Sequence, residues 1–249
     1  MSTLPVELFA SIINELETKR DILPLLLVSR SFHADSERAL YREISCMDEG
    51  EYDAIVDVRP LKRIVRFPHL AKYVFSLRIR LDYQVHGRLV NATLRATSSL
   101  RSLWLDCSGA TYPRPDLEEL VEGVSFQLHH LFLGTYLEPS DAEETSFLHM
   151  QATSLRELDF KSWDISEEIE MPNLRVLGAG LSSRAVRELV KRSRIERLRC
   201  SSLLIELLGR ALPHVRSLDI LQSIGPSEMR KFPNLTYLRI EVVGPHVSP

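Results

Sequence analysis

The sequence of 249 residues predicts an α/β protein, with a bundle of three short helices at the N-terminus and then a repeat domain whose parallel sheet has about eight strands. Three observations predict this fold. The first residues have helical apolar spacing, a six-residue apolar pattern recurs further along, and the segments between its recurrences have the spacing of helices. We expect a helical domain over residues 1–44, a helical linker over 45–70 and the repeat domain over 71–249.

Composition is that of an ordinary soluble globular protein, with 44% hydrophobic residues, 26% charged residues and a net charge of −3. This balance gives no general attraction to nucleic acids or acidic membranes, so neither is expected as a partner. The longest apolar run, residues 22–28, is too short to span a bilayer. The three cysteines are far apart, which indicates a reducing compartment. Residues 1–3 lack the basic segment of a secretory signal, and we expect a cytoplasmic or nuclear protein.

The first expected helix begins near Pro5, which suits the first turn because its missing N–H has no partner there. Phe9 and Ile13 belong to one apolar stripe, and Leu8 and Ile12 form a second stripe beside it. The apolar arc is therefore wider than one packing face needs. Something outside this helix is expected to cover the second stripe.

Two more helices are expected in the next residues. Asp21 suits the N-cap of a helix through residues 26–28, with Pro24 in its first turn. Ser29 suits the N-cap of a third helix that carries Phe32. A domain of about forty residues buries too little apolar surface to offset the conformational entropy of folding. It should therefore lean on a neighbouring domain or a partner.

These residues resemble an F-box, in their order and spacing, over about forty residues. The resemblance rests on Leu4-Pro5, Leu8, Ile12, Leu16, the run DILPLLLVSRSF at 21–32 and ALYREI at 39–44, and it departs at 31–32, where many members carry tryptophan. F-boxes bind the Skp-type adaptor of cullin-based ubiquitin ligases. The resemblance implies that the adaptor-binding residues are Leu4, Pro5, Leu8, Ile12, Leu25, Leu26 and Val28. It leaves Ile13, Leu16 and Phe32 for the domain's own core.

The linker lacks a Gly/Ser-rich stretch, so the helical domain is expected to join the repeat domain rigidly. Pro60 suits the start of a short helix that ends before Pro68. The alternative to an F-box is a helical cap of the repeat domain that binds no adaptor.

The repeat domain carries an apolar-x-x-apolar-x-apolar pattern whose starts are 19 to 28 residues apart. The eight expected strands lie within residues 74–79, 100–105, 128–133, 155–160, 174–179, 195–200, 215–220 and 235–240. Between them, Ser140 and Glu143 form a capping box, residues 184–191 have helical spacing, and residues 203–208 place four leucines on one helix face. The pattern resembles leucine-rich repeats and implies a solenoid. The asparagine ladder usual after each strand is absent.

In each strand, the residue between the last two inward positions is expected to point to the open face of the sheet. The column reads Arg78, Trp104, Phe132, Asp159, Gly178, Arg199, Asp219 and Arg239. Trp104 and Phe132 lie on adjacent strands, close enough for their rings to form one platform. Aromatics among charges are typical of binding hot spots. The candidate target-binding residues are Arg78, Trp104, Phe132, Asp159, Arg199 and Arg239. Alternatively, a loop near Trp163 folds over the rings.

Charge is uneven along the repeat domain, with seven basic residues between 184 and 199 and an acidic stretch between 138 and 170. These stretches are either solvated helix faces or a bipolar surface that orients a charged protein partner.

The sequence offers no constellation for catalysis or a cofactor. It lacks the GxSxG, P-loop, GxGxxG and HExxH patterns. Adjacent His129 and His130 point to opposite faces of a strand and cannot chelate one metal ion together. Cys107 and Cys200 continue the inward positions of their strands, as buried thiols do.

The two resemblances together imply a non-enzymatic, substrate-recruiting subunit of a Skp/cullin/F-box ubiquitin ligase. Its partners would be the Skp-type adaptor, through it a cullin, and a protein substrate that the sequence does not identify. The alternative is a leucine-rich-repeat interaction scaffold that is not linked to ubiquitin.

Overall fold

A computed structural model describes residues 8, 11–13, 15–16, 18–46, 57–81, 87–106, 116–134, 146–160, 168–180, 183–209, 211–221 and 225–241. The chain is an α/β protein, and its strands form one nine-stranded sheet in chain order over the described residues. The strand pairs are parallel. The residues divide into two compact units, 1–103 with 120–126, and 104–119 with 127–249. The predicted α/β class and parallel sheet are thus confirmed.

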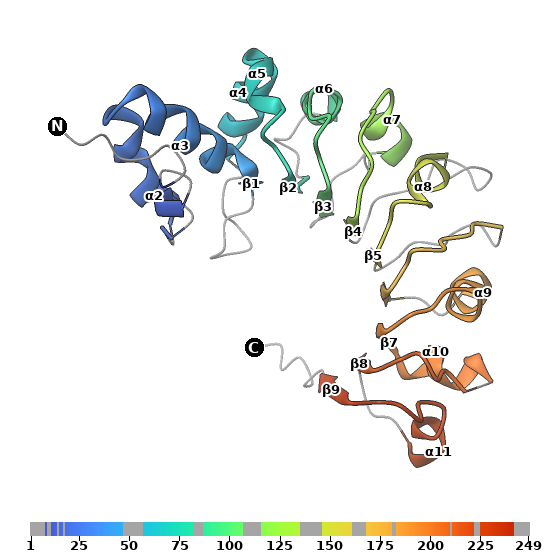
Figure 1. Ribbon diagram of the computed structural model, residues 1–249. Coiled ribbons are helices and arrows are strands. Elements are labelled where there is room, and N and C mark those ends of the chain that lie inside the picture. The colour runs from blue at the N-terminus through green and yellow to red at the C-terminus, as the bar shows by residue number, and fades with distance from the viewer. Residues whose placement is uncertain are drawn as a thin grey trace, which may run out of the picture. The chain divides into compact units, whose positions relative to one another are not determined.

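The first unit combines the N-terminal helices with the first strands. Its elements are α2 (Lys19–Ile22), the 3₁₀-helix η1 (Leu23–Leu27), α3 (Arg30–Arg42), β1 (Glu43–Ser45), α4 (Arg59–Arg66), α5 (Pro68–Ala71), β2 (Ser76–Arg80) and α6 (Gly87–Ala96). Helices α4, α5 and α6 lie on the same side of β1 and β2 (Figure 1). Helix α3 packs against η1, and α4 packs against α6.

Side-chain caps define the short N-terminal helices. The Thr18 hydroxyl accepts a hydrogen bond from the Asp21 N–H at 3.3 Å, so Thr18 caps α2 and the expected cap at Asp21 is wrong. Asp21 instead lies in the first turn, where its charge suits the positive end of the helix. Pro24 lies in the first turn of η1, as predicted. The Ser29 hydroxyl accepts from the Phe32 N–H at 3.2 Å, which confirms Ser29 as the cap of α3.

The sheet has one strand more than the eight predicted, because α3 leads directly into β1. Ile44 of β1 is buried and lies opposite Leu77 of β2. The Phe75 N–H donates to the Arg42 carbonyl at 2.9 Å, which ties the end of α3 to the start of β2. The predicted domain boundary at residue 44 therefore falls inside a strand.

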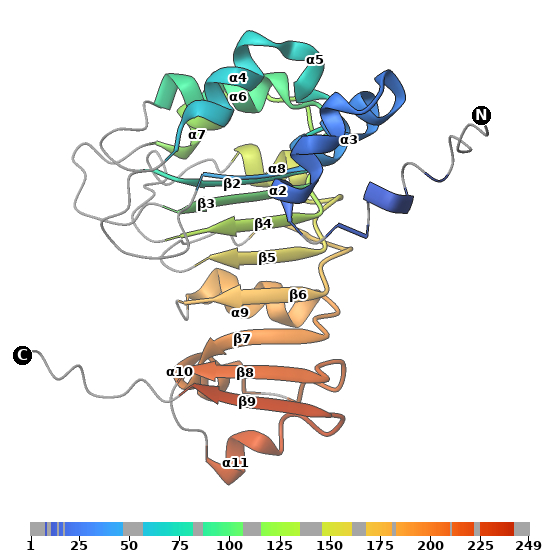
Figure 2. The same ribbon diagram turned by 90° about the vertical axis from the view of Figure 1, so that its left-hand side faces the viewer.

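The second unit continues the alternation of strands and helices. Its elements are β4 (His130–Leu133), α8 (Ser146–Gln151), β5 (Glu157–Phe160), β6 (Val176–Ala179), α9 (Arg184–Arg192), β7 (Arg197–Ser201), α10 (Ser202–Leu208), β8 (Ser217–Leu221), α11 (Pro226–Met229) and β9 (Tyr237–Glu241). β3 (Ser102–Asp106) and α7 (Leu117–Val121) have residues in both units. β4 to β9 lie side by side with their arrowheads in one direction (Figure 2).

Each strand of the second unit begins two residues after the first apolar position of the predicted pattern. The N–H groups of Arg216 and Ser217 both donate to the Glu196 carbonyl, at 2.8 and 3.0 Å. The same pair of hydrogen bonds to one carbonyl precedes β5, β6, β7 and β9. It makes a bend, so the first apolar residue enters the core before the strand starts. In the first seven repeats, the three apolar positions are at most 3% exposed.

Side-chain amides fasten the bends before the strands. Gln151, fully buried at the end of α8, accepts a hydrogen bond from the Leu128 N–H through its Oε1 at 2.7 Å. Asn173 donates to the Thr153 carbonyl at 2.7 Å, and Asn234 donates to the Pro213 carbonyl at 2.8 Å. Side-chain amides thus link neighbouring repeats before the strands rather than after them.

Helices α9 and α10 confirm two predicted segments with one change. The Ser183 hydroxyl caps α9 by accepting from the Val186 N–H. In α10, the buried residues are Leu204, Ile205 and Leu208, whereas Leu203 and Leu207 are exposed. The prediction that all four leucines share one face is wrong, because Ile205 takes the buried place expected for Leu203 and Leu207. The predicted capping box at Ser140 and Glu143 lies outside the described residues.

Strand β9 should exchange its amide hydrogens fastest among β4 to β9. Its apolar residues Leu238 and Ile240 are 39% and 44% exposed, whereas the corresponding Leu218 and Ile220 of β8 are fully buried. Less burial leaves a smaller free energy of local opening. Hydrogen exchange followed by mass spectrometry measures this order. Protection over residues 237–241 equal to that over residues 197–201 would contradict it.

Candidate functional site

The open face of the second unit carries the predicted column of side chains. Successive strands place Phe132, Asp159, Gly178, Arg199, Asp219 and Arg239 opposite one another. Inward neighbours are buried on β4 to β8, though not on β9, so the period of two separates core from open face as expected on those five strands. In the first unit, the exposed Arg78 lies opposite Ser45 of β1.

The two aromatic residues of the column form a stack. The ring centroids of Trp104 and Phe132 are 3.6 Å apart, and the ring planes are 22° from parallel. Both rings are half-buried. They form the flat platform that their adjacent positions predict. The alternative cover near Trp163 lies outside the described residues.

Beyond the rings, an ion pair crosses one strand. Arg199 Nη1 lies 3.4 Å from Asp159 Oδ2, although β6 runs between their strands. Gly178 of β6 makes this contact possible because it has no side chain. A Cβ atom at Gly178 would lie 2.4 Å from Asp159 Cγ, much closer than van der Waals contact allows.

Gly178→Ala should lower the free energy of unfolding by about 1–3 kcal/mol, the usual cost of forcing extra atoms into a packed site. The added methyl group has to displace the Asp159 carboxylate and break its contact with Arg199. The three nearest atoms to that Cβ all belong to the Asp159 carboxyl group. Gly178→Ala combined with Asp159→Ala should therefore recover most of the loss in urea unfolding. A double variant whose loss equals the sum of the two single losses would refute this account.

Charge continues along the column after Arg199. Arg239 pairs with Glu241, with Nη2 and Oε1 3.0 Å apart. Asp219 lies between Arg199 and Arg239 in the register. Its Oδ1 atom is buried and has no hydrogen-bond partner within the described part of the chain. The open face thus presents an aromatic pair followed by charges of alternating sign.

The N-terminal helices expose a second candidate surface. Among the predicted adaptor-binding residues, Leu8, Ile12 and Val28 are 45%, 39% and 61% exposed. Leu25 and Leu26 are half-buried. Leu4 and Pro5 lie outside the described residues. The expected core residue Ile13 is buried, whereas Leu16 and Phe32 are half-buried.

Two further side chains of this surface were missed by the sequence analysis. Leu23 and Leu27 belong to η1, and Leu27 is 90% exposed. The predicted adaptor-binding residues follow from the F-box resemblance, which does not single out these two leucines. Their exposure is a feature of the fold that the sequence pattern does not indicate. With these two leucines, η1 and the residue after it present three large exposed apolar side chains.

Titratable groups in the described residues give no sign of catalysis. His129 and His130 have ring centroids 6.4 Å apart with planes tilted by 58°. No cluster of three or more potential metal ligands occurs among the described residues. Burial raises the pKa of the Cys200 thiol to about 12, and burial with the nearby Asp57 charge raises that of Cys46 to about 12. Both thiols are therefore protonated at neutral pH. Cys107 lies outside the described residues.

Comparisons with models of known protein families and with curated proteins found no match for this chain. Of the helices described, none has the length and apolar character needed to cross a membrane.

Proposed function

We propose that this chain is a substrate-recruiting adaptor of a Skp/cullin/F-box ubiquitin ligase. The N-terminal helices would dock on the Skp-type subunit, and the open face of the sheet would hold a protein target. The observation that carries the proposal is the set of exposed apolar side chains on the N-terminal helices. They occur at positions that match the F-box pattern in the sequence.

The energetics of the N-terminal surface support a partner. Burying a leucine or valine side chain contributes about 1.5–3 kcal/mol. Leu8, Ile12, Leu23, Leu27 and Val28 are large apolar residues left exposed in one short segment of the chain. Several large apolar side chains exposed within one short segment favour an interaction site over an ordinary solvated face. Binding of a protein adaptor that covers these side chains would add the free energy of burying them, which the isolated chain does not have.

The open face suits a protein target. The Trp104–Phe132 stack offers a rigid apolar platform, and the charges of Asp159 and Arg199 lie in the same column. Interface hot spots combine aromatic and arginine side chains in this way. Charges of alternating sign would fix the register of a bound segment. Such a face can select a target without catalytic groups of its own.

The mechanism of the proposed function is proximity. A chain that binds the ligase through its helices and the target through its sheet raises the effective concentration of one for the other. Ubiquitin transfer is then carried out by the other subunits of the ligase. The residues of this chain bind and orient, and none needs to move a proton or form a covalent intermediate.

Co-purification with a Skp-type adaptor tests the proposal. The full-length chain and the adaptor, expressed together, should elute as one complex in size-exclusion chromatography. Elution of a folded chain apart from the adaptor would overturn the proposal. It would favour an interaction scaffold that is not linked to ubiquitin.

A further inference from the structure

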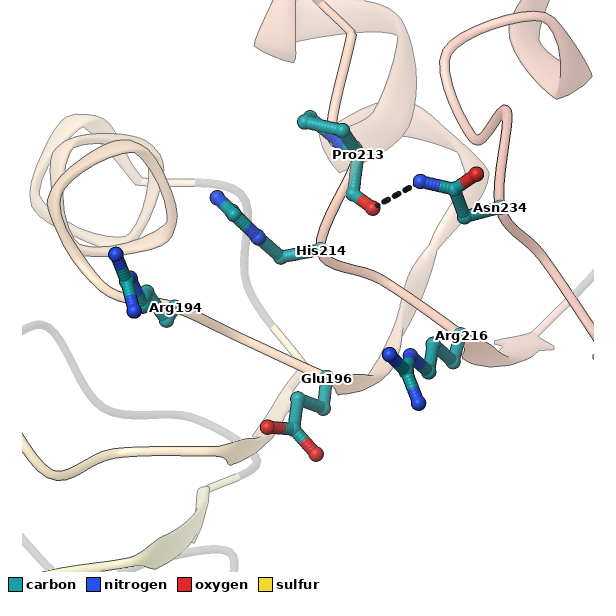
Figure 3. A pocket seen from close by; sticks show the side chains of 6 residues that line it. All are labelled: Arg194, Glu196, Pro213, His214, Arg216 and Asn234. Carbon is teal, nitrogen blue, oxygen red and sulfur yellow. Dashed lines mark hydrogen bonds between the residues drawn. The ribbon is translucent and has the colours of Figure 1, made fainter.

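A basic hollow lies at the amino ends of β7 and β8, outside the open-face column. Its volume is about 290 Å³, and Figure 3 shows the side chains around it. The lining residues are Arg194, Glu196, Pro213, His214, Arg216 and Asn234. A second hollow of about 410 Å³ shares Arg194, Pro213 and His214 with the first. The two hollows therefore adjoin at these three residues.

The charge of the hollow is positive. The side chains of Arg194 and Arg216 are exposed and form no hydrogen bond or ion pair with the described residues. Glu196 is the acidic group of the lining, and it faces Arg175, with Oε1 and Nε 3.8 Å apart. Arg175 partly offsets the charge of Glu196. Two guanidinium groups are thus available for an anion in solution.

His214 occupies a position where two other repeats have an asparagine. Those residues, Asn173 and Asn234, each donate a hydrogen bond to a carbonyl of the preceding bend. His214 forms no such bond with the described residues. Its ring instead projects from the bend toward the side of the hollow that carries Arg194, while Asn234 points to Pro213 (Figure 3). The bend before β8 therefore presents an imidazole where other bends use an amide for internal bonding.

From this lining and its free guanidinium groups we infer that the hollow binds a phosphate monoester group. Each guanidinium offers a planar fork of N–H donors that matches two phosphate oxygens, and the imidazole offers one more donor. One arginine alone satisfies a carboxylate, whereas three donor groups suit the three terminal oxygens and nearly double charge of a phosphate monoester. The adjoining hollow, with Leu212 and Val215 in its lining, leaves room for the group that carries the phosphate.

Isothermal titration of the full-length chain tests this site without any adaptor, so its result is independent of the proposed ligase role. The probes are O-phosphoserine and a short alanine-rich peptide that carries one phosphoserine, glutamate or serine. Both phosphorylated probes should bind. Arg194→Ala with Arg216→Ala should weaken their binding about tenfold or more, since charge-assisted forked bonds are lost. Arg194→Lys with Arg216→Lys should give an intermediate loss, because charge remains without the fork.

The matched control is Arg88→Ala with Arg230→Ala, which removes two exposed arginines that do not line the hollow. It should bind like the wild type. Tighter binding of the phosphopeptide than of O-phosphoserine would identify a modified protein as the source of the group. Equal binding would identify a small phosphate ester, and both results support the site. Equal binding of the glutamate peptide, unchanged binding by the double alanine or double lysine variant, or no binding of either phosphorylated probe would overturn the inference.

Discussion

Leu8→Ala combined with Ile12→Ala is expected to abolish capture of the Skp-type adaptor and to leave the melting temperature of the free chain unchanged. The two side chains are 45% and 39% exposed in the free chain, so their truncation removes only part of a packed contact. In the proposed complex they are buried, and each truncation costs about 2 kcal/mol or more. A combined loss of about 4 kcal/mol lowers affinity roughly a thousandfold. Adaptor pull-down and thermal unfolding measure the two effects.

The matched control for this pair is Val65→Ala with Phe67→Ala. These two side chains are each 38% exposed, close to the exposure of Ile12, and belong to α4 and the residue after it. The control should capture adaptor like the wild type. Leu4→Ala with Pro5→Ala should weaken capture by at least about 2 kcal/mol, because the F-box interpretation expects it to remove an apolar contact and the residue that suits the start of the first helix. Wild-type capture by either N-terminal double variant would contradict the F-box interpretation.

Trp104→Ala combined with Phe132→Ala is expected to eliminate target capture on the open face. Aromatic hot spots lose about 2 kcal/mol or more each on truncation. The stack itself contributes about 0.5–1.5 kcal/mol. For a chain of this size, that shifts the melting temperature by only a few degrees, at about 2–4 °C per kcal/mol. Quantitative mass spectrometry of co-purified proteins, with thermal unfolding beside it, measures both.

Trp104→Phe serves as the control for the aromatic pair because it keeps a stacked ring and should keep most of the capture. A large fall in melting temperature for the double alanine variant would assign the rings to the core instead. Capture unchanged from the wild type would place target binding elsewhere on the chain.

The strand pattern was predictable because one face of every strand is buried. Residues such as Leu177 and Leu198 are fully buried and lie opposite each other, so an alternation in the sequence translates directly into register. β1 escaped prediction because Ile44 matched the last apolar position of the F-box pattern equally well. A three-residue strand carries too little alternation to be separated from the end of a helix.

The candidate sites were predictable to different degrees. The stack of Trp104 on Phe132 follows from strand register alone, because side chains at equal positions of adjacent strands lie close together. The ion pair of Asp159 and Arg199 was not predicted, because the two residues are on strands that are not neighbours. It depends on the absence of a side chain at Gly178 on the strand between them. The basic hollow depends on where the ring of His214 turns, which no periodicity encodes. The cluster of basic residues between 184 and 199 indicated a charged region of the chain, but it did not predict which of them line a hollow.

The sequential order of the strands makes the second unit modular along the chain. Within the described residues, β6, β7 and β8 each pair with the strand before and the strand after them, and β9 pairs with β8, in an unchanged register. Their contacts are therefore short in sequence, which favours folding by stepwise addition of repeats rather than by closure of long loops. If one repeat were gained or lost, the strands on either side of the change could still pair in the same register. The open face could thus be lengthened or shortened during evolution while its core stays intact.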